Sequence, residues 1–454
     1  MVAMSDAEVN VADITVVPEM GGAQANVKVD RTAYLANLLK LRPTTKFDWL
    51  AQTRDQAAAI AAELAIPSTR DEAWRFTDLT PMLQHDWQLA PIDQPLEACD
   101  SLVIPEAATR LVFMNGVFQA DLSKADDLPD GVLVGNLNQL NAEQATQVTA
   151  HLAKQTGAEE VFTALNTASF TDSAIVWIPR NAAIAQPIHL VFLSRTSGTT
   201  TLSHSRCLVI AETGSQVTLV EEHTSADKHD PYFTNAVTEI YLGDNAKVNH
   251  TRVQWESPIS YHIGKTAVSQ GRDSQYVNIA IDLGAAISRH NLEVYHNGPQ
   301  ADTQLYGLSL VDGTRTADTH SITAFSQPHG TAKQLHKCIA DDKGHGVFNG
   351  SVYVPKLAQG TDASQLSRNL LLSNQARIDT KPELEIIADN VKCAHGATVS
   401  QLEDDEIFYL QSRGIAAEAA RKLLKFAFAI EVIKQIPVES LRHTLTDTMR
   451  DLSK

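Results

Sequence analysis

The stretch ISRHNLEVYHNGPQADTQLYGLSLVDGTRTADTHSITAF, residues 287–325, shows the pattern of the long middle of the chain. Short runs of β-branched, aromatic and aliphatic residues alternate with turns such as NGPQ (297–300) and DGT (312–314). From residue 286 onwards a run opens roughly every 13 to 17 positions, so two runs make a unit of about 30 residues. Such even spacing of short strands is typical of a sandwich, a propeller or a solenoid.

The same character extends over residues 172–401, which we interpret as one β domain. Long helical stretches are missing there, and a doubly wound sheet needs crossover helices. A strand–turn unit that recurs without a strict motif favours a parallel β-helix over a sandwich. We therefore predict a mainly β protein with a parallel β-helix core and helical ends.

Both flanks of this core show helical spacing of apolar residues. Residues 29–171 are predicted to form an N-terminal helical and mixed domain, with helices over 30–41, 47–65 and 141–168. Residues 402–454 are predicted to form a C-terminal helical domain, with helices over 403–411 and 416–436. The first 27 residues contain no Lys or Arg, and we expect residues 1–28 to be a disordered acidic tail.

Composition narrows the possible partners and the compartment. The net charge of −17 over 454 residues makes a nucleic acid an unsuitable partner. The four cysteines are scattered without a CxxC pair, which indicates a reducing compartment. No apolar run approaches the roughly 20 residues that span a bilayer, and the start of the chain lacks the basic residues of a signal peptide. We expect a cytoplasmic protein with no membrane partner.

Nucleotide and hydrolase motifs are not complete in this sequence. Gly264-Lys265-Thr266 resembles the end of a phosphate-binding loop, but Ile259 stands where that loop needs glycine. The glycines at 344, 346 and 350 miss the G-x-G-x-x-G spacing by one position. We therefore predict no nucleotide site of the chain's own, and any ATPase must be another subunit.

Two cysteine–histidine pairs are candidate ligand sites. Cys393 and His395 stand two apart in VKCAHGA, and side chains at i and i+2 of a strand share a face. A nearby imidazolium and Lys392 are expected to lower the thiol pKa. A metal or sulfur ligand pair, a nucleophile and a structural role all remain open for this pair. His336 and Cys338 form a second pair, and the histidines at 320, 329, 336 and 345 form a ligand cluster if they stack on neighbouring coils.

The C-terminal helices carry a candidate partner surface. The segment FAFAI in the helix over 416–436 is apolar on more than one face, which suits packing on the β domain and also a protein partner. The expected partner-binding residues are Phe408, Tyr409, Arg413, Gly414, Phe426 and Phe428.

Three segments of the chain resemble the SufD family of scaffold subunits from the SUF iron–sulfur cluster assembly system. PELEIIADNVKCAHGATVSQLEDDEIFYLQSRGI, 382–415, is similar to the family's C-terminal signature, and TRDEAWRFTDL, 69–79, to its N-terminal one. VFTALNTASFTDSAIVWIPRNAAIAQPIHLVFL, 161–193, resembles the start of the family's core. The likeness spans most of residues 30–450, in the right order.

The resemblance implies a fold, partners and a site. The family has a right-handed parallel β-helix that pairs end to end with the paralogue SufB, and its C-terminal helical domain binds the SufC ATPase. A cysteine desulfurase and a sulfur carrier act on the complex indirectly, and a reduced flavin on the complex is possible. The family's interface histidine falls on His395 and a nearby cysteine on Cys393. The pair is thus expected to ligate a transient iron–sulfur cluster shared with SufB, in a subunit that is not an enzyme.

Alternative readings are a SufB-like role, a β-helix enzyme that uses Cys393, and a homodimeric scaffold that pairs through exposed β-helix ends. Polysaccharide lyases of this fold need an acidic calcium cluster, which the sequence does not show.

Overall fold

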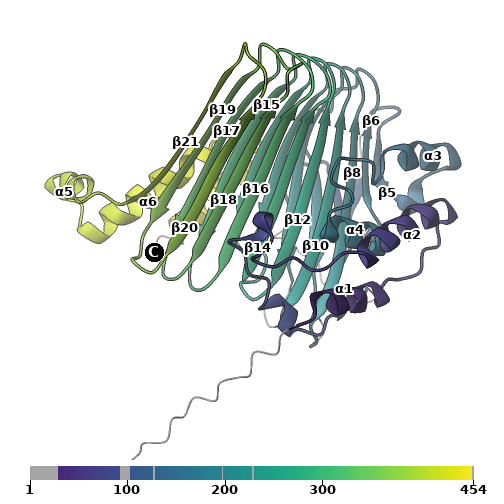
Figure 1. The fold of residues 1–454 in the computed structure, drawn as a ribbon, viewed down its shortest axis with the longest axis horizontal. Coiled ribbons are helices and arrows are strands. Elements are labelled where there is room, and N and C mark those ends of the chain that lie inside the picture. Colours follow the sequence, from purple (N-terminus) through teal and green to yellow (C-terminus); the bar gives the residue numbers. More distant parts are fainter. Residues whose placement is uncertain (1–28, 93–102, 126–127, 197, 227–229, 452–454) are drawn as a thin grey trace, which may run out of the picture.

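A computed structural model describes residues 29–92, 103–125, 128–196, 198–226 and 230–451 (Figure 1). The predicted acidic tail, residues 1–28, lies outside the described residues. The central feature is a β-solenoid of two long sheets whose strands run side by side, with helices at both ends of the chain (Figure 1). This confirms the predicted parallel β-helix core with helical ends.

Successive strands of the solenoid alternate between two sheets, here called sheet A and sheet B. Sheet A contains β1 (Gln88–Leu89), β5 (Leu133–Asn136), β6 (Ala174–Ile178), β8 (Thr201–Ala211), β10 (Tyr232–Leu242), β12 (Tyr261–Gln270), β14 (Ile287–His296), β16 (Thr316–Phe325), β18 (His345–Val354) and β20 (Arg377–Ile386). Sheet B contains β2 (Thr109–Met114), β3 (Val117–Phe118), β4 (Lys124–Ala125), β7 (Ile188–Ser194), β9 (Gln216–Ser225), β11 (Lys247–Gln254), β13 (Gln275–Asp282), β15 (Asp302–Val311), β17 (Thr331–Ala340), β19 (Asp362–Leu371) and β21 (Lys392–Gln401).

Within each sheet, the strands from β6 to β21 pair in parallel and in register with the equivalent strand of the next coil. Ile287, Thr316 and His345 are aligned in this way, so one coil takes about 29 residues, close to the predicted unit. The sheets begin before residue 172, because β2 pairs in parallel with β7. The division into 29–171, 172–401 and 402–454 stays a prediction.

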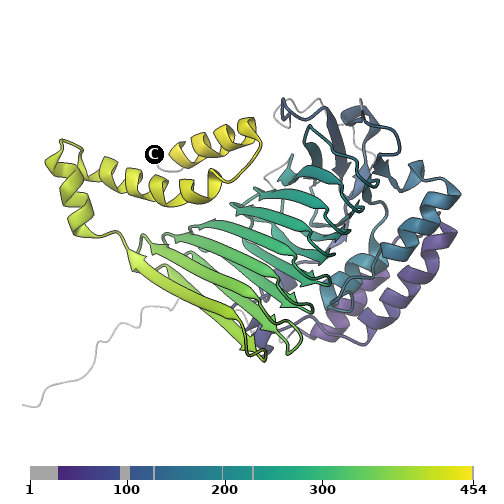
Figure 2. The same cartoon turned by 90° about the horizontal axis from the view of Figure 1, so that it is seen from above.

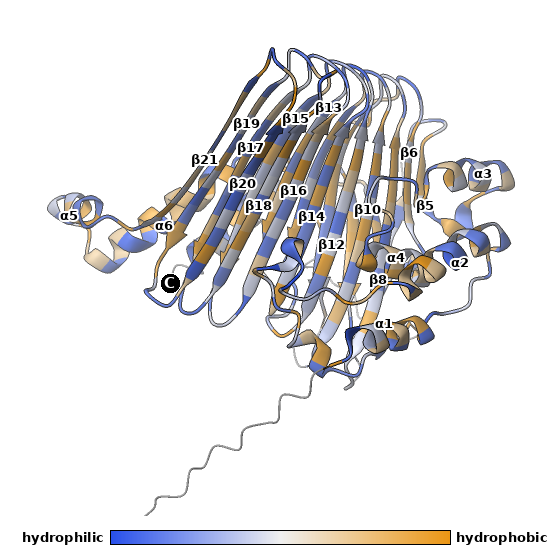
Figure 3. Ribbon diagram, viewed as in Figure 1, coloured by the Kyte–Doolittle hydropathy of each residue, from blue (hydrophilic) through white to orange (hydrophobic). Residues whose placement is uncertain are grey.

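The interior of the solenoid is apolar along one side. Val209, Ile240, Val268 and Val294 occupy one register position of successive sheet A strands and are buried against Leu219 and its neighbours in sheet B. Burying each such side chain stabilises the fold by about 1.5–3 kcal/mol. The hydropathy colouring of the strands shows apolar and polar residues interleaved along them (Figure 3).

The N-terminal helices cover the outer face of sheet A (Figure 1). α1 (Arg31–Lys40) and α2 (Asp48–Ala62) confirm the first two predicted helices. The single helix predicted over 141–168 is wrong, because the structure has α3 (Ala142–His151) and α4 (Val161–Ser169). Ala153 between them has φ 60°, and its N–H bonds to the Glu239 carboxylate of β10 at 2.9 Å rather than continuing a helix.

Two of the three C-terminal helices cover the outer face of sheet B (Figure 2). α5 (Asp404–Ser412) and α6 (Ala417–Ile433) confirm the two predicted helices, and α7 (Glu439–Asp451) was not predicted. α7 buries a narrow stripe of Leu441, Leu445 and Met449 on an otherwise polar helix. α5 projects away from the sheets in Figure 2. Within the described ranges, no helix is long and apolar enough to cross a bilayer.

Four short 3-10 helices complete the described secondary structure: η1 (Glu72–Trp74), η2 (Met82–Gln84), η4 (Ala120–Leu122) and η5 (Leu137–Gln139). The first lies in the N-terminal signature and anchors it to sheet A. Arg289 of β14 stacks on Trp74, 4.3 Å from the ring centre, and donates to the carbonyl of Ala73 at 2.8 Å. The same guanidinium donates to buried Asp318 at 2.6 Å, which also accepts from Thr77. The signature therefore has a structural role.

Candidate functional site: the open end of the solenoid

The last coil of the solenoid leaves both sheets open at the C-terminal end. Among the strands that the structure describes, β20 of sheet A pairs only with β18, and β21 of sheet B pairs only with β19. Several apolar side chains are exposed at this end: Ile386 (40%), Ile387 (51%) and Val399 (44%). An exposed strand edge carries unpaired N–H and C=O groups that can pair with another chain. The open end thus combines hydrogen-bonding edges with apolar side chains.

Cys393 and His395 lie together on β21 at this open end. Cys393 is in register with Ala363 of β19, and His395 is in register with Gln365. Both β19 residues are 2% exposed and belong to inward-facing positions of the solenoid. Side chains two apart on a strand share a face, so Cys393 and His395 face the interior, where no further coil covers them. Cys393 is half-buried and His395 is exposed.

The expectation of a lowered thiol pKa at Cys393 is wrong. Burial raises the pKa of this thiol above its usual value, and the nearby carboxylate of Asp362 acts in the same direction. Lys392 precedes Cys393 on the strand, so its side chain points to the opposite face and cannot stabilise a thiolate directly. In the chain by itself, Cys393 is therefore a protonated thiol at neutral pH.

A ladder of polar side chains lies directly below this pair, with Gln365 and Ser321 buried and Gln334 half-buried. Gln365 donates to the side-chain carbonyl of Gln334 at 2.8 Å, and Gln334 in turn bonds to Ser321 at 2.9 Å. A Cβ at Gly350 of sheet A would lie 2.1 Å from the Gln365 amide nitrogen, so the missing side chain leaves room for Gln365 in this position. The strand position of His395 is therefore next to polar side chains of the two preceding coils.

A larger polar network fills the interior near the opposite end. His223 and His250 contact the two oxygens of Glu221 at 2.8 and 3.1 Å. Burial acts to raise the pKa of Glu221, but these two hydrogen bonds outweigh it and hold the pKa well below its usual range. A second set joins Glu256 to His262 (2.6 Å), His262 to Arg252 (2.7 Å) and Arg252 to Asp282 (2.8 Å).

These buried groups do not form a metal centre in the part of the chain that the structure describes. No three His, Cys, Asp or Glu side chains converge there as a ligand set. His336 and Cys338 are both 2% exposed, and burial raises the pKa of the Cys338 thiol to about 12. The condition for a histidine cluster is not met, because His320, His336 and His345 pair with non-histidine residues in the neighbouring strands and His329 lies in a turn.

The C-terminal helices place the predicted partner-binding residues in two environments. Phe408 and Tyr409 of α5 are 70% and 57% exposed. Arg413 stacks on the Tyr409 ring at 5.2 Å, and Gly414 adopts φ +85° where α5 ends. Leu423 of α6 adds 44% exposed surface that the sequence did not indicate.

Phe426 and Phe428 are instead partly buried on sheet B. The ammonium of Lys337 lies 4.2 Å from the Phe428 ring centre, and the Arg450 guanidinium 5.5 Å from that of Phe426. Of the aromatic residues predicted to bind a partner, Phe408 and Tyr409 are thus the two that present a free surface.

The matches to known proteins cover almost the whole described chain. Residues 192–428 match the family model described as "SUF system FeS cluster assembly, SufBD core domain", and residues 37–190 match "SufBD protein N-terminal region". An iron–sulfur cluster assembly SufBD family protein of Synechocystis is 46% identical over 87% of this chain and 89% of its own length. The iron–sulfur cluster assembly protein SufD of Escherichia coli is 29% identical, with 83% and 87% covered. SufD of Bacillus subtilis is 27% identical, with 88% and 93% covered.

Proposed function

Because the chain belongs to the SufBD family of SUF-system iron–sulfur cluster assembly proteins, we propose that it is a non-enzymatic scaffold subunit of the SufD type. In this proposal the open end of the solenoid pairs with a SufB-type β-helix, and a nascent cluster is held between the two. The observation that carries the proposal is the pair of unpaired edges at β20 and β21 in the described chain, with Cys393 and His395 on the inner face of the last strand.

The open end provides only part of the ligand set that an iron–sulfur cluster needs. An iron–sulfur cluster is commonly held by about four protein ligands, mostly thiolates and in some clusters imidazoles. The open end supplies one imidazole, His395, and one thiol, Cys393, and the described residues hold no third ligand beside them. A partner chain that seats on the same edges would provide the remaining ligands. His395 is the leading ligand, since it is exposed and needs no loss of a proton from a buried thiol.

The cluster is the cargo of this scaffold, and the iron and sulfide come from elsewhere. A desulfurase and a sulfur carrier would deliver sulfur to the assembled complex rather than to this chain alone. The raised pKa of Cys393 supports this assignment, because a protonated thiol is a poor nucleophile for sulfur transfer or acyl transfer. The same observation disfavours a β-helix enzyme built on Cys393.

The exposed apolar residues of α5 and α6 suit the docking of a SufC-type ATPase. Phe408, Tyr409 and Leu423 present aromatic and aliphatic surface of the kind that anchors protein interfaces. α6 is tied to the solenoid, because Lys337 of β17 donates to the Phe428 carbonyl at 3.0 Å and pairs with Glu431. A displacement of α6 by the ATPase would therefore be transmitted to β17 of sheet B, which is two strands away from β21.

The test of pairing uses the exposed apolar residues of the open end. Ile387→Lys and Val399→Lys place charges on that surface, and we expect at least tenfold weaker binding of a SufB-type partner. Ile259, 38% exposed in a turn between β11 and β12, gives the control Ile259→Lys, which should bind normally. Light scattering of the purified chain, alone and mixed with the partner, measures both heterodimer and homodimer. Normal pairing by the two end variants would refute the proposed interface.

A further inference from the structure

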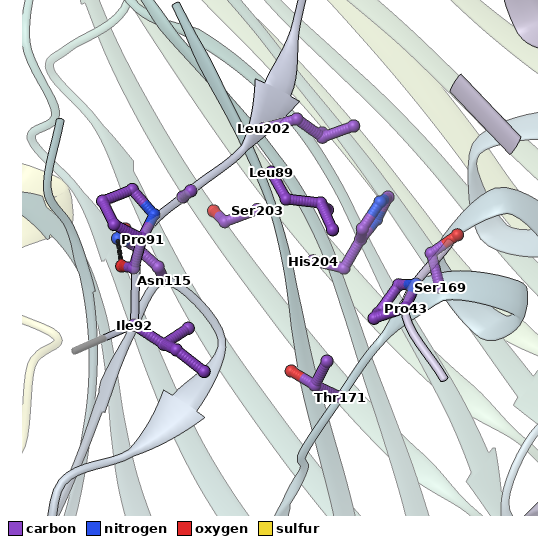
Figure 4. A pocket seen from close by; sticks show the side chains of 11 residues that line it. Pro43, Leu89, Pro91, Ile92, Asn115, Ser169, Thr171, Leu202, Ser203 and His204 are labelled. Atoms are coloured by element: carbon purple, nitrogen blue, oxygen red, sulfur yellow. Dashed lines mark hydrogen bonds between the residues drawn. The ribbon is translucent and has the colours of Figure 1, made fainter. Parts of the chain in front are cut away.

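A cavity at the other end of the solenoid has the composition of a small-molecule site. It has a volume of about 360 Å³ and lies beside β8 and β1, in the first coils, whereas Cys393 and His395 lie on the last. Figure 4 shows Pro43, Ser169 and His204 on one side of it and Pro91 and Ile92 on the other. Leu89 and Leu202 add further apolar wall, and the described residues that line the cavity include no carboxylate.

Two polar side chains on one wall of the cavity have unused hydrogen-bonding atoms. His204 is 5% exposed, and its Nδ1 has no hydrogen-bond partner. Ser169 is 2% exposed, and its Oγ has no partner either. Buried polar groups are nearly always hydrogen-bonded, because an unpaired one costs about 1–3 kcal/mol. Both atoms thus lie buried in the cavity wall without a protein partner, and a molecule that reaches them gains a hydrogen bond without breaking one.

An uncompensated positive charge lies directly behind the same wall. Arg54 is 0% exposed, and it donates to the carbonyls of Pro43 (2.6 Å) and Ala168 (2.9 Å), while its Nη1 has no partner. Within the described chain no carboxylate forms an ion pair with it, since the adjacent Asp55 pairs with Arg42 at the surface. Burial lowers the pKa of Arg54 to about 10, which still leaves the guanidinium charged at neutral pH.

His204 adds a neutral hydrogen-bond donor to this charge. Burial, together with the nearby Arg54 charge, lowers the pKa of His204 to about 3, so its imidazole is uncharged at neutral pH. A neutral imidazole carries one N–H and can donate it to an oxyanion. A hydroxyl and an imidazole N–H on one wall, with a buried guanidinium behind it, favour a negative group, whereas the opposite wall favours an apolar body.

We propose that this cavity binds a small organic anion, with its carboxylate or similar oxyanion at Ser169 and His204 and its apolar body against Leu89, Ile92 and Leu202. The attraction of the Arg54 charge orients the ligand. A molecule of this class would bind independently of the open end of the solenoid and independently of the proposed scaffold role.

The test titrates the full chain with hexanoate and with hexanamide, its neutral analogue, by isothermal titration calorimetry at low salt. We expect hexanoate to bind in about the millimolar range, at least tenfold tighter than hexanamide, a difference of about 1.4 kcal/mol. Ser169→Ala removes no internal hydrogen bond, so the variant should fold normally and bind hexanoate severalfold more weakly. Equal binding of the two probes, or no binding of hexanoate at millimolar concentration, would overturn the proposal.

Two substitutions of the same residue at the mouth of the cavity, one charged and one neutral, give a matched pair of variants. Leu89 is 41% exposed, so Leu89→Asp and Leu89→Asn should both fold, and they differ from each other only in charge. Leu89→Asp should weaken hexanoate about tenfold relative to Leu89→Asn, and this difference should shrink as salt screens the charges. Hexanoate affinities that are equal in the two variants would contradict an electrostatic site.

Discussion

Acid should destabilise this protein through its buried imidazoles, and His336 allows the effect to be isolated. The ring is 2% exposed and stacks on Phe348 at 4.5 Å, and neither ring nitrogen has a hydrogen-bond partner. Burial lowers the pKa of His336 from 6.5 to about 4, against the opposing pull of Asp282 and Asp318. The unfolded chain therefore takes up this proton at a higher pH than the folded chain does.

The sign and the size of the effect follow from that pKa difference. The contribution to stability is fully present above the unfolded pKa of 6.5 and is lost as the pH falls towards 4. One pKa unit corresponds to about 1.4 kcal/mol, so the full loss is about 3 kcal/mol. Between about pH 7.5 and about pH 5 the single group should remove about 2 kcal/mol from the free energy of unfolding.

The assay compares the wild type with His336→Phe by urea unfolding at the two pH values. Phenylalanine keeps the stack on Phe348 and loses no hydrogen bond, although the ring lies over Gly307 and has little spare room. A fixed packing cost cancels, because the measured quantity is the change with pH. The variant should lose about 2 kcal/mol less than the wild type on acidification. His443, whose side chain is 68% exposed on α7, gives His443→Phe as the control for the substitution itself. Equal losses in wild type and His336→Phe would show that His336 does not take up a proton on unfolding in this pH range.

Three further predictions concern the anchor of the N-terminal signature, the helical surface and the half-buried thiol. Arg289→Met leaves buried Asp318 without its guanidinium and should cost about 3–5 kcal/mol in thermal or urea unfolding, largely restored by adding Asp318→Asn; a loss below about 1 kcal/mol would contradict the ion pair. Phe408→Glu with Tyr409→Glu should abolish binding of the ATPase subunit in a pull-down while the circular dichroism spectrum stays unchanged, and retained binding would exclude this surface. Cys393 should react with iodoacetamide more slowly than a free model thiol at about pH 8, as peptide mass spectrometry can measure, because burial raises its pKa; an equal or faster rate would contradict the burial argument.

The architecture could be predicted from the sequence because it depends on local signals. Strands at even spacing with turn residues between them, as in residues 287–325, indicate the solenoid, and apolar spacing indicates α1, α2, α5 and α6. The break between α3 and α4 could not be predicted, since it depends on Glu239 of β10, which is distant in sequence. α7 was missed because its apolar stripe is narrow and its other faces are polar.

The candidate site was partly visible in the sequence. The spacing of Cys393 and His395 predicted a shared face, and the strand supplies that face. The polar ladder below them was not visible, because Gln365 and Gln334 stand one coil apart and meet only when the strands are in register. The thiol pKa was misjudged because Lys392, a sequence neighbour, lies on the other face of the strand. Burial is the largest cause of the raised pKa, and burial cannot be read from the sequence.

If His395 at the open end holds a nascent cluster between this chain and a SufB-type subunit, as proposed, then removing its imidazole must abolish cluster formation. The most direct measurement reconstitutes the complex with a SufB-type subunit and a SufC-type ATPase, supplies iron, sulfide and reductant, and follows cluster formation by visible absorption and Mössbauer spectroscopy. His395→Ala should assemble the complex normally and lose cluster formation, whereas the control His443→Ala should keep it. A normal cluster yield from a fully assembled His395→Ala complex would contradict the account.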